Sequence, residues 1–574
     1  MLNILLDGIS ILNTYKVGII VFFIAIFGFG LLAIKYIATE ELDSGVVLLS
    51  SFSLGSIVLS IVSYALILLS HFWPSVLHIG SFAILIFAIF ILITKFWSGE
   101  FKAIYNTQLI MAGTALLLLL VARLAFLKYI ILPPYSDSPI HYQIVQGFLH
   151  PELSGDSKLS LGTIFTNYYH FGFHGLAAWL AAITNIEAAN IISLLGQLFL
   201  VIAPISILFL TYITTKNLNG ALFAGLLTAT GWLMPAFAVN WGKFPALNSL
   251  AVVPSVIGYV GLYLHKDTKK PIATFFVLAF LVGIVLIHTR IVICLFLAGI
   301  GYFLSGKLRI TDEPGYSQSI RLSLFYIISL WPLSELLLNF YVKFPVLVIL
   351  LILLPFAFKV YPRLSAGIFF YTFGLWLIML GSNLLNKNSQ TLLDRQFLEI
   401  MLYIPFSTLG GAGLAGLLKS IPSTGILRWS AITLLAGCIM LNFLYNNSLY
   451  PNPCCDYFKE GDRLALLWLQ ENSSEHSLVI ISTFDNNGKI VGTDAGIWIY
   501  PLNRQATNKL PFNTNWEALD GWEKVCNTGA EETYIYMGGR QYSFVDAQLM
   551  QAKWIKQVYK AGETVIYQVS ECPN

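Results

Sequence analysis

Residues 188–214 read AANIISLLGQLFLVIAPISILFLTYIT, a stretch without a charged side chain. A helix needs about 20 such apolar residues to cross the hydrocarbon core of a bilayer, where no water satisfies the backbone groups. The stretch is therefore predicted to span a membrane. Similar apolar stretches lie on both sides of it, so the chain is expected to cross the bilayer many times.

About fourteen spans are predicted in total. They are residues 17–38, 45–70, 75–97, 108–131, 188–214, 218–238, 246–265, 272–288, 290–305, 319–341, 343–360, 362–382, 399–418 and 425–446. One further apolar segment, Phe171–Thr184, is too short to cross and is interpreted as a half-helix or an interfacial helix.

The overall composition agrees with this pattern. Of the 574 residues, 57% are hydrophobic and 11% are charged, and the mean hydropathy is +0.73. Soluble domains carry about 25% charged residues because their surface must be solvated. A soluble multidomain protein and a disordered chain are both excluded. The predicted fold class is a polytopic α-helical membrane protein.

The C-terminal residues 452–574 differ from the rest of the chain. They contain 10 Lys/Arg and 15 Asp/Glu, which gives a net charge of −5 and leaves +8 for residues 1–451. This charge density is typical of a soluble domain. Its pattern predicts a mixed α/β fold: helices near 464–468 and 544–559, and strands at 478–482, 496–500, 533–536 and 564–569. The chain is thus divided into a transmembrane domain, 1–451, and a C-terminal domain, 452–574.

Basic residues gather in alternate connections between the predicted spans. They are Lys266, Lys269, Lys270, Lys307, Arg309, Arg321, Lys359, Arg363, Lys419 and Arg428. Cytoplasmic loops are enriched in Lys and Arg. The remaining connections, which include the long loop 132–187, and the C-terminal domain are therefore predicted to lie on the exoplasmic side of the cell membrane.

Four cysteines lie in the C-terminal domain, namely Cys454, Cys455, Cys526 and Cys572. An even number of cysteines in an exoplasmic domain indicates two disulfides, although the sequence leaves their pairing open. The alternative is four free thiols in a cytoplasmic domain.

Ionisable groups near membrane depth are candidates for function, and here they fall mainly in the exoplasmic connections. Asp137 and His141 are four residues apart, so a helix that begins near Pro139 brings them close together. His170 and His174 have the same spacing. The other polar groups are Lys243, His288, Arg290, Asp394, Arg395 and Glu399. Together they predict a cavity at the outer leaflet, whose cations suit the phosphate of a lipid carrier.

Each of these residues also has an ordinary interpretation. Asp137 fits a helix cap, Lys243 and Arg290 fit cations that snorkel to the headgroups, and Asp394 with Arg395 fits a local ion pair. The spacing of His170 and His174 fits a metal chelate, but the sequence has no HExxH motif and no third ligand at a suitable spacing. Participation of a divalent cation is left open. No phosphate-binding loop or dinucleotide fingerprint occurs, and nothing indicates a nucleic-acid partner.

Several local motifs resemble the multi-spanning C-type (GT-C) glycosyltransferase superfamily, in particular a prokaryotic branch with an exoplasmic C-terminal domain. They are YSDSPIHY at 135–142, YHFGFHG at 169–175, HTR at 288–290 and LDRQFLE at 393–399. In the C-terminal domain, WLQEN at 468–472 and DAGIWI at 494–499 are similar to the domains attached to such enzymes.

The resemblance implies sugar transfer from a polyprenyl-phosphate donor to a glycan, lipid or protein acceptor at the outer membrane face. Asp137 would be the general base, and Lys243, Arg290 and Arg395 would bind the departing phosphate. His141, His170, His174, His288, Asp394 and Glu399 would position the sugar or the acceptor. Two other classes of function compete with this one: a many-span transporter or lipid flippase, and a non-catalytic membrane scaffold.

Overall fold

The computed structural model describes residues 2–37, 44–98, 107–151, 170–265, 271–308, 314–341, 346–385, 395–421, 425–445, 448–474, 476–486, 489–516, 524–526, 529–540 and 542–570. The chain folds into two compact units. The larger comprises Met1–Lys128, Val145–Val239 and Phe244–Tyr450. The smaller comprises Tyr129–Ile144, Asn240–Lys243 and Pro451–Asn574, so two short segments from the membrane half of the sequence join the C-terminal region.

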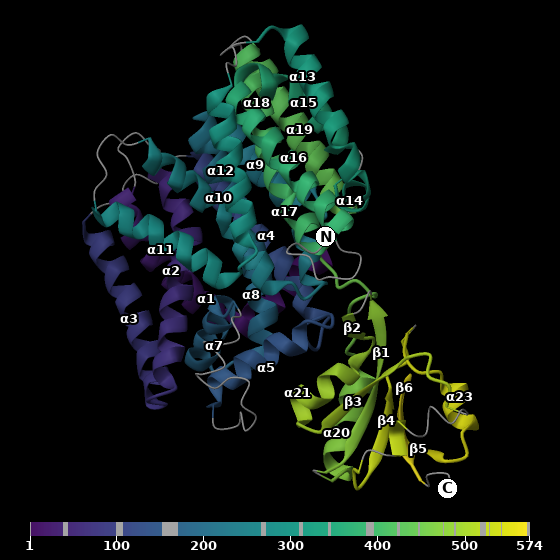
Figure 1. The fold of residues 1–574 in the computed structure, drawn as a ribbon. Helices are drawn as coiled ribbons and strands as arrows, with labels where there is room; N and C mark the ends of the chain where they lie inside the picture. Colours follow the sequence, from purple (N-terminus) through teal and green to yellow (C-terminus); the bar gives the residue numbers. More distant parts are fainter. Residues whose placement is uncertain are drawn as a thin grey trace. The chain divides into compact units, whose positions relative to one another are not determined.

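The larger unit is built from helices (Figure 1). Within the described residues, nine helical segments are long and apolar enough to cross a bilayer. They are α1 (Leu2–Ile37), α2 (Ser44–Ser70), α3 (Ser75–Trp97), α4 (Thr107–Leu124) with its 3-10 extension η2 (Ala125–Lys128), α8 (Ala188–Thr215), α10 (Phe244–Leu264), α16 (Pro362–Leu385), the pair α17 (Arg395–Met401) and α18 (Tyr403–Ser420), and α19 (Gly425–Tyr445). The prediction of a polytopic helical membrane protein is confirmed.

Shorter helices complete this unit. They are α7 (Gly172–Thr184), α9 (Leu218–Leu226) with its π-helical continuation η4 (Leu227–Gly231), η5 (Ala236–Val239), α11 (Pro271–Ile287), α12 (Ile291–Lys307), α13 (Tyr316–Ser329), η6 (Trp331–Leu333), α14 (Ser334–Phe340) and α15 (Val346–Val360). At a rise of 1.5 Å per residue, the 13 residues of α7 extend only about 20 Å. The predicted half-helix at 171–184 is therefore present.

Nine of the fourteen predicted spans coincide with the nine long helices, and three coincide with α11, α12 and α15. The prediction of one span at 218–238 is wrong over its last part, because α9 and η4 end at Gly231 and the short η5 follows at Ala236–Val239. The prediction of one continuous span at 319–341 is wrong. The chain changes there from α13 to the 3-10 turn η6 and then to α14. Pro332 lies in that turn, where its missing N–H and fixed φ interrupt a regular helix. The first helix also begins earlier than predicted, at Leu2, with a non-helical residue at Tyr15.

Buried serines hold three of the long helices together. The Ser53 hydroxyl of α2 lies 2.7 Å from the Ser255 hydroxyl of α10, and Ser206 of α8 donates to Ser255 at 2.9 Å. All three side chains are fully buried. Because lipid tails are as apolar as leucine, membrane helices associate through small residues and interhelical hydrogen bonds of this kind.

Helices α1 and α2 approach each other closely at two glycines. A Cβ atom on Gly55 of α2 would overlap the carbonyl oxygen of Ile26 on α1, and one on Gly30 of α1 would overlap the carbonyl oxygen of Ser51 on α2. Any side chain at either position would have to push the two backbones apart. The contact between these helices therefore depends on glycine.

The smaller unit contains a six-stranded sheet in the order β2-β1-β4-β6-β5, with β3 paired to β1 (Figure 1). The strands are β1 (Leu478–Asn486), β2 (Lys489–Gly492), β3 (Ala506–Pro511), β4 (Thr533–Met537), β5 (Ile555–Ala561) and β6 (Thr564–Val569). β1 runs parallel to β3 and β4, whereas its pairing with β2 and the pairings of β6 with β4 and β5 are antiparallel. The accompanying helices are α20 (Glu460–Asn472), η7 (Ala495–Trp498), α21 (Ile499–Asn503) and α23 (Asp546–Gln551). The predicted mixed α/β fold is confirmed.

Two predicted elements of this unit are wrong. Residues 496–500 form η7 and the start of α21 instead of a strand, because the Asp494 carboxylate caps the turn by accepting from the Gly496 N–H at 3.0 Å. The predicted helix 544–559 is helical only over α23. Its last part is β5, which pairs with β6. Strand pairing with a distant segment overrides the local helical pattern there.

Alternate residues of the strands are buried on both faces of the sheet. Ile480, Ile535 and Tyr567 belong to one apolar cluster, which also contains Trp516 and Leu549. On the other face, Trp468 of α20 contacts the rings of Tyr534 and Tyr559, and the Tyr536 hydroxyl donates to Asp462. The sheet is thus covered on both faces.

The cysteines of the smaller unit lie in disulfides where they are described. Cys454 is bonded to its neighbour Cys455, and Cys526 is also disulfide-bonded. Cys572 lies outside the described residues. The two cysteines of the membrane helices, Cys294 and Cys438, are free thiols.

We predict that Gly55→Ala destabilises the larger unit, because the added methyl group overlaps the α1 backbone at Ile26. Overpacking of this kind costs about 1–3 kcal/mol. The measurement is the thermal midpoint of the purified protein in detergent. The matched control is Gly299→Ala on α12, where a Cβ meets nothing within 4 Å. Equal midpoints for the two variants would contradict the prediction.

Candidate functional site

Asp137 lies at the start of the helix that the sequence predicts. The chain reverses at Tyr135, whose φ is 69°, and α5 (Ser138–Leu149) follows. The Ser138 hydroxyl donates to the Pro134 carbonyl, and the His141 N–H donates to the Asp137 carbonyl at 3.3 Å. The Asp137 carboxylate is thereby held at the positive end of α5, where the helix dipole favours an anion.

The Asp137 carboxylate forms an ion pair with Lys243. Lys243 Nζ lies 2.7 Å from Asp137 Oδ2, and the two side chains are 16% and 19% exposed, respectively. Both residues belong to the smaller unit, although 106 positions separate them in the sequence. The pair is thus shielded from bulk water but still accessible to a polar ligand.

The turn that carries Lys243 reaches Asp137 because residue 242 is glycine. Gly242 has φ +60°, and a Cβ atom there would lie 2.6 Å from the Ser138 hydroxyl and 2.9 Å from the Pro134 carbonyl oxygen. Glycine meets both demands, because it adopts positive φ readily and has no side chain to separate the two loops.

His141 also links the start of α5 to the turn that carries Lys243. Its Nε2 lies 3.1 Å from the Gly242 carbonyl oxygen, and its side chain is buried. Burial lowers the pKa of His141 to about 4, and the Lys243 ammonium acts in the same direction, while the Asp137 carboxylate opposes them. The ring is therefore neutral at pH 7. Because a carbonyl only accepts hydrogen bonds, Nε2 carries the ring proton.

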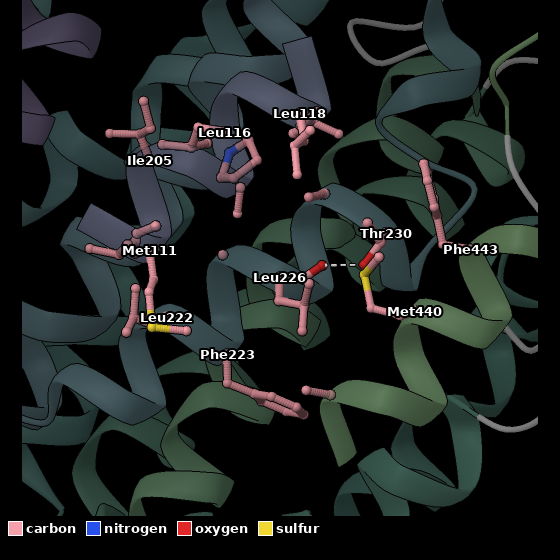
Figure 2. Close-up of a pocket in the computed structure, with 18 of the residues that line it drawn as sticks. Met111, Leu116, Leu118, Ile205, Leu222, Phe223, Leu226, Thr230, Met440 and Phe443 are labelled. Atoms are coloured by element: carbon pink, nitrogen blue, oxygen red, sulfur yellow. Dashed lines mark hydrogen bonds between the residues drawn. The ribbon is translucent and has the colours of Figure 1, made fainter. Parts of the chain in front are cut away.

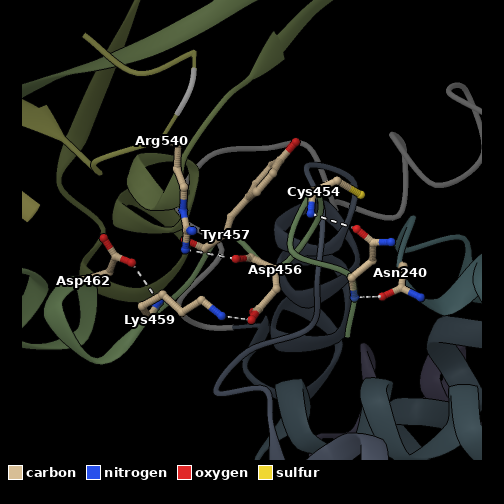
Figure 3. A network of polar contacts seen from close by, with 8 residues as sticks. Asn240, Cys454, Asp456, Tyr457, Lys459, Asp462 and Arg540 are labelled. Atoms are coloured by element: carbon tan, nitrogen blue, oxygen red, sulfur yellow. Dashed lines mark hydrogen bonds and ion pairs between the residues drawn. The ribbon is translucent and has the colours of Figure 1, made fainter. Parts of the chain in front are cut away.

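The segment after residue 451 also contacts the Asp137 loop and the turn 240–243. The Tyr135 N–H donates to the Cys455 carbonyl at 2.8 Å, and the Asn452 N–H donates to the Asn240 side-chain oxygen at 2.7 Å (Figure 3). The rings of Tyr135 and Tyr457 lie 6.0 Å apart. We name this structure the three-segment site. It consists of the segment 129–144, the turn 240–243 and the segment after residue 451.

Tyr457 and Arg540 join this site, although the sequence did not single them out. An Arg540 Nη donates to the carbonyls of Asp456, at 3.1 Å, and Tyr457, at 3.4 Å (Figure 3). Lys459 pairs with the Asp456 carboxylate. Burial raises the pKa of Tyr457, and the nearby Tyr135, Asp494 and Asp137 raise it further. The Tyr457 phenol therefore remains a hydrogen-bond donor at neutral pH.

The other predicted site residues lie in the larger unit. The His170 and His288 ring centroids are 4.3 Å apart, and His288 stacks on Phe397 at 5.2 Å. His170 precedes α7, which begins at Gly172, whereas His174 is buried within that helix. The four-residue spacing of His170 and His174 therefore does not place both on one helix. Among the residues that the structure describes, no three or more His, Cys, Asp or Glu side chains form a group that could hold a metal ion.

The predicted loop near residue 395 begins a helix. Arg395 Nε donates to the Glu399 carboxylate at 2.9 Å, four residues along α17. The Tyr341 hydroxyl donates to the Glu399 carbonyl at 2.5 Å. Arg290 directly precedes α12, and Asp394 lies outside the described residues.

Comparisons with known proteins give a limited match. Residues 47–314, just under half of the chain, match the model of a family of unknown function, DUF6541. No protein of curated function matches the chain. The cryo-EM structure of the arabinofuranosyltransferase AftD from mycobacteria is distantly similar, with 12% identity and a TM-score of 0.33 over 70% of this chain. The match spans only 36% of that larger protein.

We predict that acid weakens the three-segment site through His141. An unfolded histidine has a pKa near 6.5, whereas that of His141 is about 4. The unfolded state therefore binds a proton between these values and the folded state does not. The stability that neutral His141 contributes is complete above pH 6.5 and falls by about 3 kcal/mol as the pH approaches 4.

The test compares the thermal midpoint of the parent protein with that of His141→Gln, which does not titrate, between pH 7.5 and 4.5. The thermal midpoint of the parent, relative to that of the variant, should decrease as the pH falls. His265→Gln, at an exposed histidine of the larger unit, is the control. A parent-minus-variant difference that stays constant across this range would refute the assignment.

Proposed function

We propose that the chain is a membrane glycosyltransferase that moves a sugar from a polyprenyl-phosphate donor to an acceptor at the outer membrane face. The observation that carries the proposal is the largely shielded ion pair of Asp137 and Lys243. Both residues belong to the smaller unit, which also carries the α/β sheet, and their segments lie next in sequence to helices of the larger unit. A lipid-linked sugar and an extramembrane acceptor would meet at such a place.

Asp137 is the general base in this proposal. Its carboxylate removes the proton of the acceptor hydroxyl or amide as that group attacks the anomeric carbon of the sugar. The bond between this carbon and the phosphate oxygen breaks, and polyprenyl phosphate leaves with the bonding electrons. A positioned base contributes roughly 10²–10⁴-fold to the rate.

Lys243 links donor binding to the base. In the structure its ammonium is bound to Asp137, and a donor phosphate would compete for the same ammonium. Once Lys243 turns to the phosphate, the Asp137 carboxylate is free to accept a proton. The ammonium then stabilises the negative charge that develops on the leaving group, which is usually the larger catalytic contribution.

The smaller unit supplies the acceptor side. Tyr457 offers a phenol donor near Asp137, and Arg540 is a positioning residue that holds the backbone of residues 456–457. Arg290 and Arg395 remain proposed ligands of the donor phosphate. The remaining polar residues, His141, His170, His174, His288, Asp394 and Glu399, remain proposed positioning residues.

We predict that Asp137→Asn lowers the rate of sugar transfer by about 10²–10⁴-fold, because asparagine keeps the shape but does not accept a proton. The measurement is transfer by the purified protein in lipid from labelled polyprenyl-phosphate sugars. Asp485→Asn, at an exposed carboxylate of β1, is the matched control, and elution as one symmetric peak checks folding. A well-folded Asp137→Asn variant with parental activity would remove Asp137 from the mechanism.

We also predict that Tyr457→Phe lowers kcat/KM for the acceptor up to about tenfold, which corresponds to the loss of one hydrogen bond. The change should fall mainly on the acceptor KM, with the donor KM unchanged. Tyr559→Phe is the control, because its ring packs on Trp468 within the same unit. An unchanged acceptor KM would place the acceptor elsewhere.

A further inference from the structure

An apolar slot of about 500 Å³ runs along the membrane helices of the larger unit (Figure 2). It follows α4 from Met111 to Ala122 and α19 from Trp429 to Phe443, with α8 and α9 forming the wall between them. At 1.5 Å per residue these stretches measure about 16 and 21 Å. Half of the hydrocarbon core of a bilayer is about 15 Å thick, so the slot matches the length of one leaflet.

Part of the slot's lining is exposed on the outside of the helices, where lipid would contact it. The lining side chains of Met111, Leu118 and Trp429 are exposed by 67%, 55% and 59%, respectively. Small lining residues, among them Ala115 and Gly225, leave space inside the slot because they have little or no side chain. The hydroxyl of the lining residue Thr230 donates to the Leu226 carbonyl at 2.8 Å (Figure 2), so it presents no unsatisfied donor to an apolar occupant.

Arg123 lies at one end of the slot. One Nη atom donates to the carbonyl of Ala229 at 3.2 Å, and the guanidinium carbon is 6.0 Å from the Phe443 ring centroid. Ala229 and Phe443 both line the slot. The other Nη donates to the Ser448 carbonyl at 3.2 Å. These contacts fix the guanidinium beside the end of α4 that continues into the Asp137 loop.

Arg123 has no counter-charge within the described parts of the chain. The side chain is 3% exposed, its Nε has no hydrogen-bond partner, and no carboxylate pairs with it among the residues that the structure describes. The two carbonyls satisfy donors but leave a net positive charge. A buried charge without a counter-charge is costly, and within membranes such a residue usually has a functional partner.

We propose that the slot binds one acyl chain of an anionic phospholipid, whose phosphate lies at Arg123. The apolar walls take the chain, and the guanidinium binds the phosphate oxygens, for which its planar fork is suited. A zwitterionic phospholipid brings a phosphate with its own cation, so the slot prefers lipids with net negative charge. This lipid is a bound partner of the protein and not the sugar donor, so the inference does not depend on the proposed function.

The test measures the phospholipid that the purified full-length protein retains from vesicles of equal parts phosphatidylglycerol and phosphatidylcholine, by native mass spectrometry. The parent should retain phosphatidylglycerol in preference, and Arg123→Gln should reduce its retention about tenfold. Arg123→Lys should restore part of it. Arg321→Gln, at an exposed arginine of α13, is the matched control and should behave as the parent.

A second variant tests the slot without touching the charge. Ala436→Phe fills space inside the slot, which Ala436 lines, and should abolish retention, whereas Leu434→Phe, at an exposed position of α19 outside the slot, should not. Excess inorganic phosphate should compete only weakly, because it has no chain. Parental retention by Arg123→Gln or by Ala436→Phe would overturn the proposal, as would full displacement of the lipid by phosphate alone.

Discussion

The close approach of the turn 240–243 to the loop 134–138 is the contact on which the candidate site depends. Gly242 permits it, because its φ is positive and a Cβ there would meet Ser138 and the Pro134 carbonyl. The polar contacts of the site depend on this close approach. Lys243 reaches Asp137, and the neutral His141 ring bonds the Gly242 carbonyl. A larger residue at position 242 would separate the base from its cation.

Much of the fold follows from the sequence because a bilayer admits few solutions. Long apolar runs such as 188–214 have to become helices in lipid, and nine helices of the described residues are long and apolar enough to cross a bilayer. Local pattern also located α20, β1, β4 and β6. It failed at residues 496–500 and 544–559, where an Asp494 cap and pairing with β6 override the local pattern.

The candidate site was predictable only in part. The proximity of Asp137 and His141 follows from the geometry of one helix. Such local geometry can be predicted from the spacing of residues in the sequence. The pairing of Asp137 with Lys243, and the contacts of Tyr457 with Tyr135 and Arg540, join segments separated by more than eighty residues. Residue types and spacing carry no information about such contacts. The vicinal Cys454 and Cys455 mark the neighbourhood of Tyr457 in the sequence, but not its contact with Tyr135. The predicted sidedness of the membrane stays a prediction.

The most direct test of the central claim is a mass balance on the wild-type protein. Purified protein in lipid vesicles is given one labelled polyprenyl-phosphate sugar at a time together with crude cell-envelope acceptors. The account predicts that one donor yields labelled acceptor and an equal amount of free polyprenyl phosphate. Absence of both products with every donor, together with movement of lipid or solute across the same vesicles, would contradict it and favour a transporter.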